Sequence, residues 1–146
     1  MALPELTETG DLPPGVHPAT LPEVLHRFGT GSGRRQSLGR RLQRVHEVAL
    51  STGHLARFVV FGSFITSKTA PNDVDVFMIM DDDFDFGQVR GAARLLFQHA
   101  PAQDHFGCSV FWVRRLAALG GEQAAIEDWQ IKRDGSLRGI VEIVGE

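Results

Sequence analysis

The sequence predicts an α/β protein with a small mixed β-sheet, helices packed mainly on one side of the sheet, and a C-terminal β-hairpin. Three features support this prediction. Residues 57–61 and 73–80 are nearly continuous apolar runs, as is typical of central strands covered on both faces. Residues 34–52 place apolar side chains at helical spacing. Residues 129–144 carry Asp-Gly between two strand-like runs, a pattern typical of a hairpin.

The composition indicates one domain without a membrane partner. The chain has 146 residues, 42% of them apolar, and a domain of this size buries about two thirds of its unfolded surface. No apolar run is long enough to cross a bilayer, and the N-terminus lacks the pattern of a secretory signal. A single cysteine, Cys108, rules out an intramolecular disulfide and a cysteine zinc cluster. We therefore expect a cytoplasmic protein.

The first third of the chain predicts an arm followed by helices. Residues 1–19 are rich in proline, glycine and acidic residues, so we expect an extended N-terminal arm, with residues 20–146 forming a single domain. Thr20-Leu-Pro-Glu23 is a capping-box sequence that predicts a short helix ending near Phe28. Residues 29–33 carry glycine at alternate positions and are interpreted as a flexible link.

The predicted helix over residues 34–52 has Gly53 at its C-terminal cap. Several of its arginines fall mostly off the apolar stripe: Arg34, Arg35, Arg41 and Arg44. They have two interpretations, a solvated face or a surface that binds phosphate groups. The net charge of −3 does not indicate a nucleic-acid binder.

The elements after the second strand are predicted from caps and turns. One of the acidic residues 81–85 is expected to cap a helix over residues 86–99, which Pro101 closes. The remaining elements are a third strand, a helical stretch broken by two glycines, and the hairpin, over residues 106–113, 114–128 and 129–144.

Asp73 and Asp75 open the second strand and are the strongest candidates for chemistry. Strand side chains alternate between faces, so both carboxylates project on the same side, about 6–7 Å apart along the strand. At an effective dielectric constant near 20, two such charges repel by roughly 2.5–3 kcal/mol. A raised pKa, an arginine, water or a divalent metal must offset that repulsion. Oxygen ligands favour Mg²⁺ or Mn²⁺ over zinc.

Gly62-Ser63 ends the first strand and is the second half of the candidate site. A glycine after a strand allows a ligand to approach the main chain, and the neighbouring N–H groups with the Ser63 hydroxyl can hold a phosphate. Lys68 lies in the following loop, where it either contacts that phosphate or is simply exposed to solvent. A phosphate cradle beside a metal-holding carboxylate pair describes a metal-triphosphate site.

Gly62-Ser63, nine residues, then Asp73-Val74-Asp75 resembles the signature of the DNA polymerase beta-like nucleotidyltransferase superfamily, particularly its minimal members. The resemblance implies that Gly62 and Ser63 hold the triphosphate and that Asp73 and Asp75 hold Mg²⁺. The segments 12–21 and 138–143 also resemble a bacterial group of nucleotidyltransferase-like proteins. That likeness extends over most of the chain but implies no substrate.

Catalytic members of the resembled superfamily often carry a third carboxylate on a following strand, as general base and second metal ligand. The corresponding position here is Ser109, which does neither job well. Asp104, just ahead of that predicted strand, is the nearest substitute. This departure puts catalysis in question more than nucleotide binding.

The resemblance implies transfer of a nucleoside monophosphate from a nucleoside triphosphate, with ATP the first candidate, to an unknown hydroxyl acceptor. Acceptors in the superfamily include proteins, RNA ends and small aminoglycoside-like molecules, although the net charge does not indicate RNA. A protein partner or a homodimer would complete the site, because the chain is too short for a separate acceptor domain. Two alternatives stay open: a catalytically degraded fold that binds a protein partner, as an antitoxin or regulatory subunit does, and a nucleotide sensor.

Overall fold

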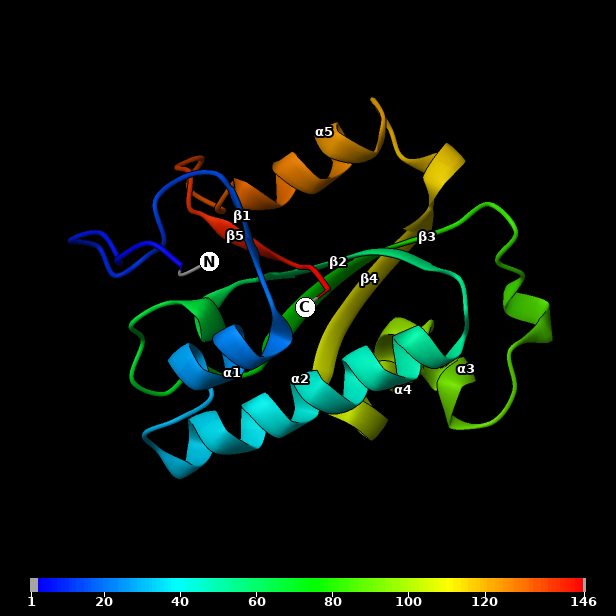
Figure 1. The fold of residues 1–146 in the computed structure, drawn as a ribbon, viewed down its shortest axis with the longest axis horizontal. Coiled ribbons are helices and arrows are strands. Elements are labelled where there is room, and N and C mark those ends of the chain that lie inside the picture. The colour runs from blue at the N-terminus through cyan, green and yellow to red at the C-terminus, as the bar shows by residue number, and fades with distance from the viewer. Residues whose placement is uncertain (1–2, 146) are drawn as a thin grey trace.

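The computed structural model describes residues 3–145 and confirms a mixed α/β architecture (Figure 1). One five-stranded sheet has the order β1-β5-β2-β3-β4, in which β1 and β5 are parallel, β3 and β4 are parallel, and β2 is antiparallel to both its neighbours. The strands are β1 (Val16–Ala19), β2 (Leu55–Phe61), β3 (Val74–Met80), β4 (Cys108–Arg114) and β5 (Ile140–Ile143). The α-helices are α1 (Leu21–Phe28), α2 (Gly33–Ser51), α3 (Ala92–Leu96), α4 (His99–Phe106) and α5 (Glu122–Glu127).

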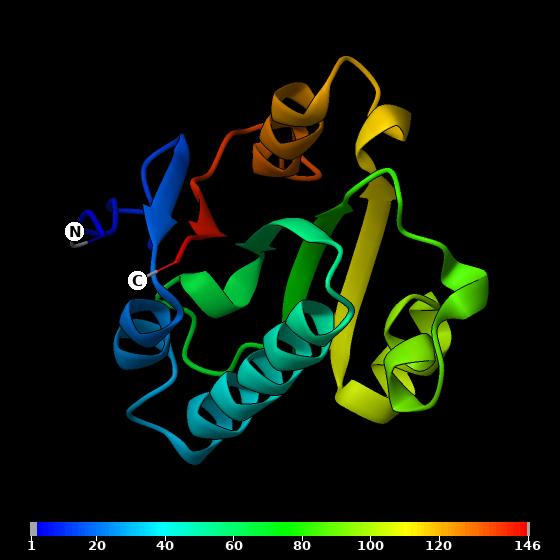
Figure 2. The same cartoon turned by 45° about the vertical axis from the view of Figure 1, so that its right-hand side comes forward.

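The helices cover the two faces of the sheet unequally. Helices α1 to α4 lie against one face and α5 lies against the other, as the two ribbon views show (Figures 1 and 2). The alternation of β3 explains the two cores: Val74, Val76 and Met78 face the larger one, and Phe77 and Ile79 face the smaller one under α5. Because a single short helix covers the second face, part of that face stays open.

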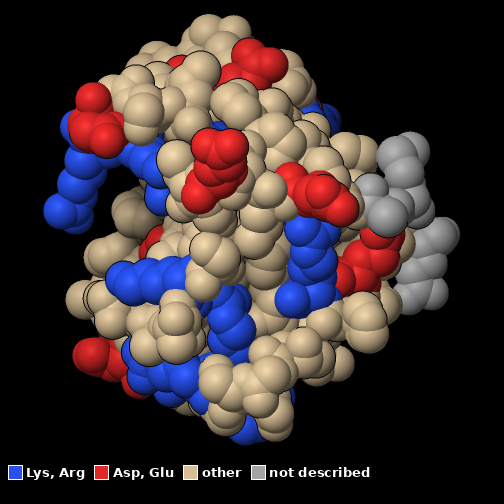
Figure 3. Space-filling view, turned by 90° about the vertical axis from the view of Figure 1, so that its left-hand side faces the viewer, with Lys and Arg blue, Asp and Glu red and all other residues tan. Residues whose placement is uncertain are grey.

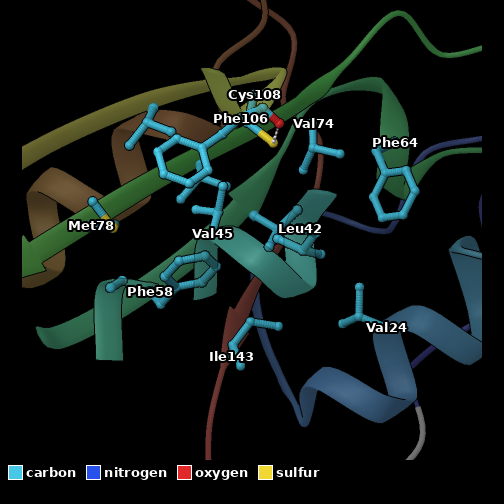
Figure 4. Packing of buried hydrophobic residues seen from close by; sticks show 14 of the residues in the cluster. Val24, Leu42, Val45, Phe58, Phe64, Val74, Met78, Phe106, Cys108 and Ile143 are labelled. Atoms are coloured by element: carbon cyan, nitrogen blue, oxygen red, sulfur yellow. Dashed lines mark hydrogen bonds between the residues drawn. The ribbon is translucent and has the colours of Figure 1, made fainter. Parts of the chain in front are cut away.

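Helix α2 supplies the centre of the larger core. Its predicted apolar stripe is confirmed, since Leu38, Leu42, Val45 and Ala49 are fully buried. Figure 4 shows Leu42 and Val45 pointing at the sheet, toward Phe58 and Val74. Each such side chain contributes about 1.5–3 kcal/mol to folding by leaving water.

The predicted capping box of α1 is confirmed. The Thr20 hydroxyl accepts a hydrogen bond from the Glu23 N–H, and the Glu23 carboxylate accepts one from the Thr20 N–H. Two orphan N–H groups are satisfied, which fixes the start of the helix immediately after β1.

The N-terminal arm belongs to the sheet, apart from residues 1–2, which lie outside the described residues. Strand β1 pairs with β5, and Leu12 is only 1% exposed. The arm also contacts two loops: Ser67 N–H donates to the Gly10 carbonyl, and Gly139 N–H donates to the Leu12 carbonyl. Residues 16–19 are therefore an edge strand rather than an appendage.

The prediction of a helix over residues 86–99 is wrong. The chain forms a short 3₁₀ turn over Phe86–Gln88, then α3 and α4. Gly91 has φ 67°, which interrupts a right-handed helix. Pro101 lies in the first turn of α4, where a missing N–H is harmless, so it does not close a helix. The capping role expected of an acidic residue is confirmed, because Asp85 accepts from Gly87 N–H.

The predicted C-terminal hairpin is confirmed only beside its turn. Gly135 has φ 85°, and the Asp134 carboxylate accepts from Ser136 N–H at 2.9 Å. Ile131 and Leu137 form an antiparallel bridge, and Lys132 N–H and Arg138 N–H donate across the turn to the carbonyls of Ser136 and Gln130. The rest of the second arm becomes β5, whose two edges pair with β1 and β2.

Among residues 3–145, no helix has the length and apolar character needed to cross a membrane.

Candidate functional site

The candidate site lies on the partly covered face of the sheet, at the end that α5 leaves open. Asp75 in β3 is paired with Phe61 of β2 on one side and with Ser109 of β4 on the other. Asp73 precedes the strand by one residue. A hollow of about 800 Å³ opens here. It is lined by Phe61, Gly62, Ser63, Lys68, Asn72, Asp73, Asp75, His99, Ser109, Phe111, Trp129, Ile131, Lys132, Arg133 and Arg138.

The structure brings together five of the six residues predicted for the site. Gly62, Ser63, Lys68, Asp73 and Asp75 all line the same hollow. Two elements place them: β2 ends at Phe61 and releases Gly62-Ser63, and β3 begins beside that bend. The antiparallel pairing of β2 and β3 brings the end of one strand next to the start of the other.

Asp104, the sixth residue, lies elsewhere. It lies on α4 and lines a different hollow together with Arg40, Arg41 and Arg44 of α2. The structure therefore does not place it as a substitute third carboxylate. Among residues 3–145 no group of three or more His, Cys, Asp or Glu side chains is arranged to hold a metal ion.

Gly62 allows the Asp75 carboxylate to lie against the main chain. Its backbone has φ 86° and ψ −166°, a conformation open to glycine and strained for other residues. A Cβ atom at this position would overlap the Asp75 carboxylate. The glycine therefore serves two purposes, the sharp bend after β2 and the space for the acid.

The two carboxylates are incompletely neutralised. Burial and, after it, the adjacent Asp73 carboxylate together raise the pKa of Asp75 to about 7, although Arg138 and Ser109 oppose the shift. The Ser109 hydroxyl donates to Asp73 Oδ2 at 2.7 Å. Ser109 is thus paired with Asp75, at the position where the resemblance implies a third carboxylate. It supplies a hydrogen bond instead of a negative charge.

Cations line the hollow around this pair. Figure 3 shows lysine and arginine atoms gathered above and below a hollow on that face. Lys132 forms an ion pair with Asp11. Within the described part of the chain, Lys68, Arg133 and Arg138 form no ion pair. Arg138 lines the hollow as a residue, while its Nε is buried and has no hydrogen-bond partner.

Aromatic side chains form a second part of the lining. Trp129 packs over Phe61 and Phe111, with ring centroids 4.4 Å and 5.1 Å apart. The His99 ring centroid lies 5.0 Å from that of Phe111. We call His99, Phe111 and Trp129 the aromatic wall. The wall is assembled from α4, β4 and the 3₁₀ turn after α5, so no local pattern in the sequence predicts it.

The residues present fit a hard divalent cation. Asp73 and Asp75 offer carboxylate oxygens to one hollow, and burial together with the neighbouring acid raises the pKa of Asp75, a shift that a bound cation would oppose. Oxygen donors of this kind suit Mg²⁺ or Mn²⁺, which complete their coordination with water and substrate oxygens.

Comparisons with curated proteins and with solved structures find no match. One family model, described as a family of unknown function (DUF6932), matches residues 4–144. The match spans nearly the whole chain, including the two strands, the bend and the loops that form the hollow. The chain therefore belongs to this family.

Proposed function

We propose that the protein is a Mg²⁺- or Mn²⁺-dependent nucleotidyltransferase that moves a nucleoside monophosphate from a nucleoside triphosphate to a hydroxyl acceptor and releases pyrophosphate. One observation carries the proposal: two adjacent, partly neutralised carboxylates and a glycine-serine bend line the same hollow, together with Lys68, Arg133 and Arg138, which form no ion pair among residues 3–145. Such a combination suits a metal-bound polyphosphate.

Each residue has a role that follows from its position. Asp73 and Asp75 would hold the metal ion, which when bound neutralises the triphosphate and polarises the phosphorus. Gly62 and Ser63 line the hollow, where main-chain N–H groups and the Ser63 hydroxyl would bind phosphate oxygens.

Lys68 and Arg138 complete the binding of the phosphates. Both line the hollow. The N–H donors of an arginine match phosphate oxygens in geometry and charge. We infer that the guanidinium of Arg138 binds the polyphosphate from the wall of the hollow.

A second candidate function is nucleotide binding without turnover, as in a sensor or a partner-binding module of the antitoxin or regulatory type. The observation that favours it is Ser109, which is paired with Asp75 where a third carboxylate would act as general base. A hydroxyl that donates to Asp73 cannot take up the proton of an acceptor.

The test is incubation with Mg²⁺ and α-labelled ATP, alone and with cell lysate, for the unchanged protein and an Asp73→Asn/Asp75→Asn variant. The matched control is Asp104→Asn, a carboxylate that lies in the other hollow. Label transfer that is lost in the double variant and on chelation of the metal, and retained in Asp104→Asn, supports the transferase.

The other outcomes separate the alternatives. Metal-dependent ATP binding without label transfer supports the sensor. If neither transfer nor metal-dependent binding is observed, nucleotide chemistry is excluded and the partner-binding module is left.

A further inference from the structure

We propose that the aromatic wall binds the base of the nucleotide, so that the hollow holds the nucleoside at one end and the phosphates at the other. This inference rests on the proposed function and adds the orientation of the substrate. It is carried by the position and exposure of the wall relative to the carboxylates.

The distance between the aromatic wall and the carboxylates of Asp73 and Asp75 matches the length of a nucleoside. Ser109 is paired with Asp75, and Phe111 is two residues further along the same face of β4. Two strand residues advance about 6–7 Å. The sugar of a nucleotide separates its base from its first phosphate by a comparable distance, so a base on Phe111 leaves that phosphate beside Asp75.

The wall is accessible to a ligand. Phe111 is 37% exposed, although it packs against Phe61 and Trp129 on one side. His99 is also exposed and is inclined by 36° to the Phe111 ring. An exposed aromatic surface inside a hollow, rather than on a convex surface, is typical of a ligand site.

The charged groups and the aromatic groups of the hollow lie at opposite ends, in the order found along a nucleotide. Gly62, Ser63 and the carboxylates gather at the end where β3 begins, and the aromatic rings lie further along β4. A nucleoside triphosphate is likewise charged at one end and aromatic at the other. Because every base has a π face, stacking alone discriminates weakly between bases, and we expect binding with little base preference.

The test compares Mg²⁺-ATP with Mg²⁺-tripolyphosphate, which has the phosphates and no base. Binding is measured by calorimetry for the unchanged protein, Phe111→Leu and Phe111→Trp. We expect Phe111→Leu to weaken ATP binding about tenfold, since stacking on an aromatic side chain contributes that much or more. Phe111→Leu should leave tripolyphosphate binding unchanged. Phe111→Trp, which keeps an aromatic ring, should bind ATP about as tightly as the unchanged protein.

Two controls make the result interpretable. Phe86→Leu removes a half-buried phenylalanine of the 3₁₀ turn before α3, away from the hollow, and should change neither ligand. Asp73→Asn/Asp75→Asn should abolish the metal-dependent binding of both ligands. If it does not, the proposed function fails together with the orientation.

The inference alone is overturned if tripolyphosphate requires the carboxylates but binds as tightly as ATP, or if Phe111→Leu weakens both ligands equally. It is also overturned if Phe111→Leu leaves ATP binding intact and weakens a single-stranded oligonucleotide instead, because the wall would then serve a nucleic-acid acceptor. In each case the phosphate end of the site still stands.

Discussion

At the scale of single residues, the acids of the site lower the stability of the folded protein. Asp75 lies partly buried beside another acid, and both burial and Asp73 raise its pKa. Ionised carboxylates in this arrangement destabilise the folded state until a cation joins them. Residues that cost stability without a structural benefit are typical of functional sites.

We predict that Asp75→Asn stabilises the metal-free protein at pH 8 while abolishing nucleotide binding. An acid whose folded pKa is raised takes up protons on folding, so the protein loses stability as the pH rises from about 4 through about 7. The amide does not titrate and escapes that loss. We expect a gain of about 1–2 kcal/mol at pH 8, allowing for partial exposure to water, and almost none at pH 4.

Urea unfolding at both pH values in the presence of a chelator measures this gain. Asp104→Asn serves as the comparison and should leave stability nearly unchanged at both. A variant Asp75→Asn that is less stable at pH 8 than the unchanged protein would show that the carboxylate is structural.

Gly62 gives a second prediction at this scale. Gly62→Ala combines a strained φ with overlap on the Asp75 carboxylate, so we expect a loss of about 2–5 kcal/mol in the free energy of unfolding. Gly53→Ala is the matched control, because Gly53 has φ 76° and nothing near its Cβ position. That control should cost only the strain, about 1–2 kcal/mol. Equal losses for the two variants would mean that the carboxylate moves aside.

At the scale of elements, the success of sequence reasoning follows the range of the interactions. The apolar stripe of α2 and the two acids at the start of β3 depend on neighbours a few residues away, so the sequence predicts them. The helix expected over residues 86–99 fails because Gly91 breaks it locally. The hairpin is shorter than expected because β5 pairs with β1 and β2, over a hundred and about eighty residues away, and no local pattern encodes that pairing.

The same reasoning explains which site residues were missed. Arg138 reaches the hollow because β5 inserts beside β2, and Trp129 reaches it because α5 folds over the second face. Both placements depend on pairing between distant segments. The carboxylates and the bend, in contrast, lie on two strands joined by one short loop.

The contribution of the N-terminal arm yields a prediction at the scale of elements. Leu12→Ala should cost about 2–4 kcal/mol in the free energy of unfolding, because Leu12 is packed in the larger core. Leu119→Ala is the comparison, since Leu119 is 89% exposed and should change stability by less than about 0.5 kcal/mol. Unfolding midpoints in urea compare the two variants. A near-zero effect of Leu12→Ala would show that the N-terminal arm does not contribute to the stability of the domain.

At the scale of the whole molecule, the local charge matters more than the net charge. The chain carries −3 overall, yet Lys68, Arg133 and Arg138 line one hollow without ion pairs among the described residues. An anion therefore meets a favourable potential at this site despite the acidic surface elsewhere.

We predict that Arg138→Gln weakens Mg²⁺-tripolyphosphate binding about tenfold, as expected for the loss of a hydrogen bond between charged groups. The affinity of the unchanged protein should fall as salt rises, and that dependence should be shallower in the variant. Calorimetry at two salt concentrations measures both effects. Arg90→Gln, an exposed arginine outside this hollow, is the control. Equal affinities for the two variants would remove Arg138 from the phosphate site.

The pairing of β1 with β5 has a consequence for how the protein is made. The ribosome produces residues 16–19 more than a hundred residues before residues 140–143, so the first strand lacks its neighbour until those residues have been synthesised. Trp129 and Arg138 are added shortly before them. A nascent chain halted ahead of residue 129 holds the acids and the bend but lacks the tryptophan and the arginine, so the proposed nucleotide binding should appear only after residues 129–143 have been added.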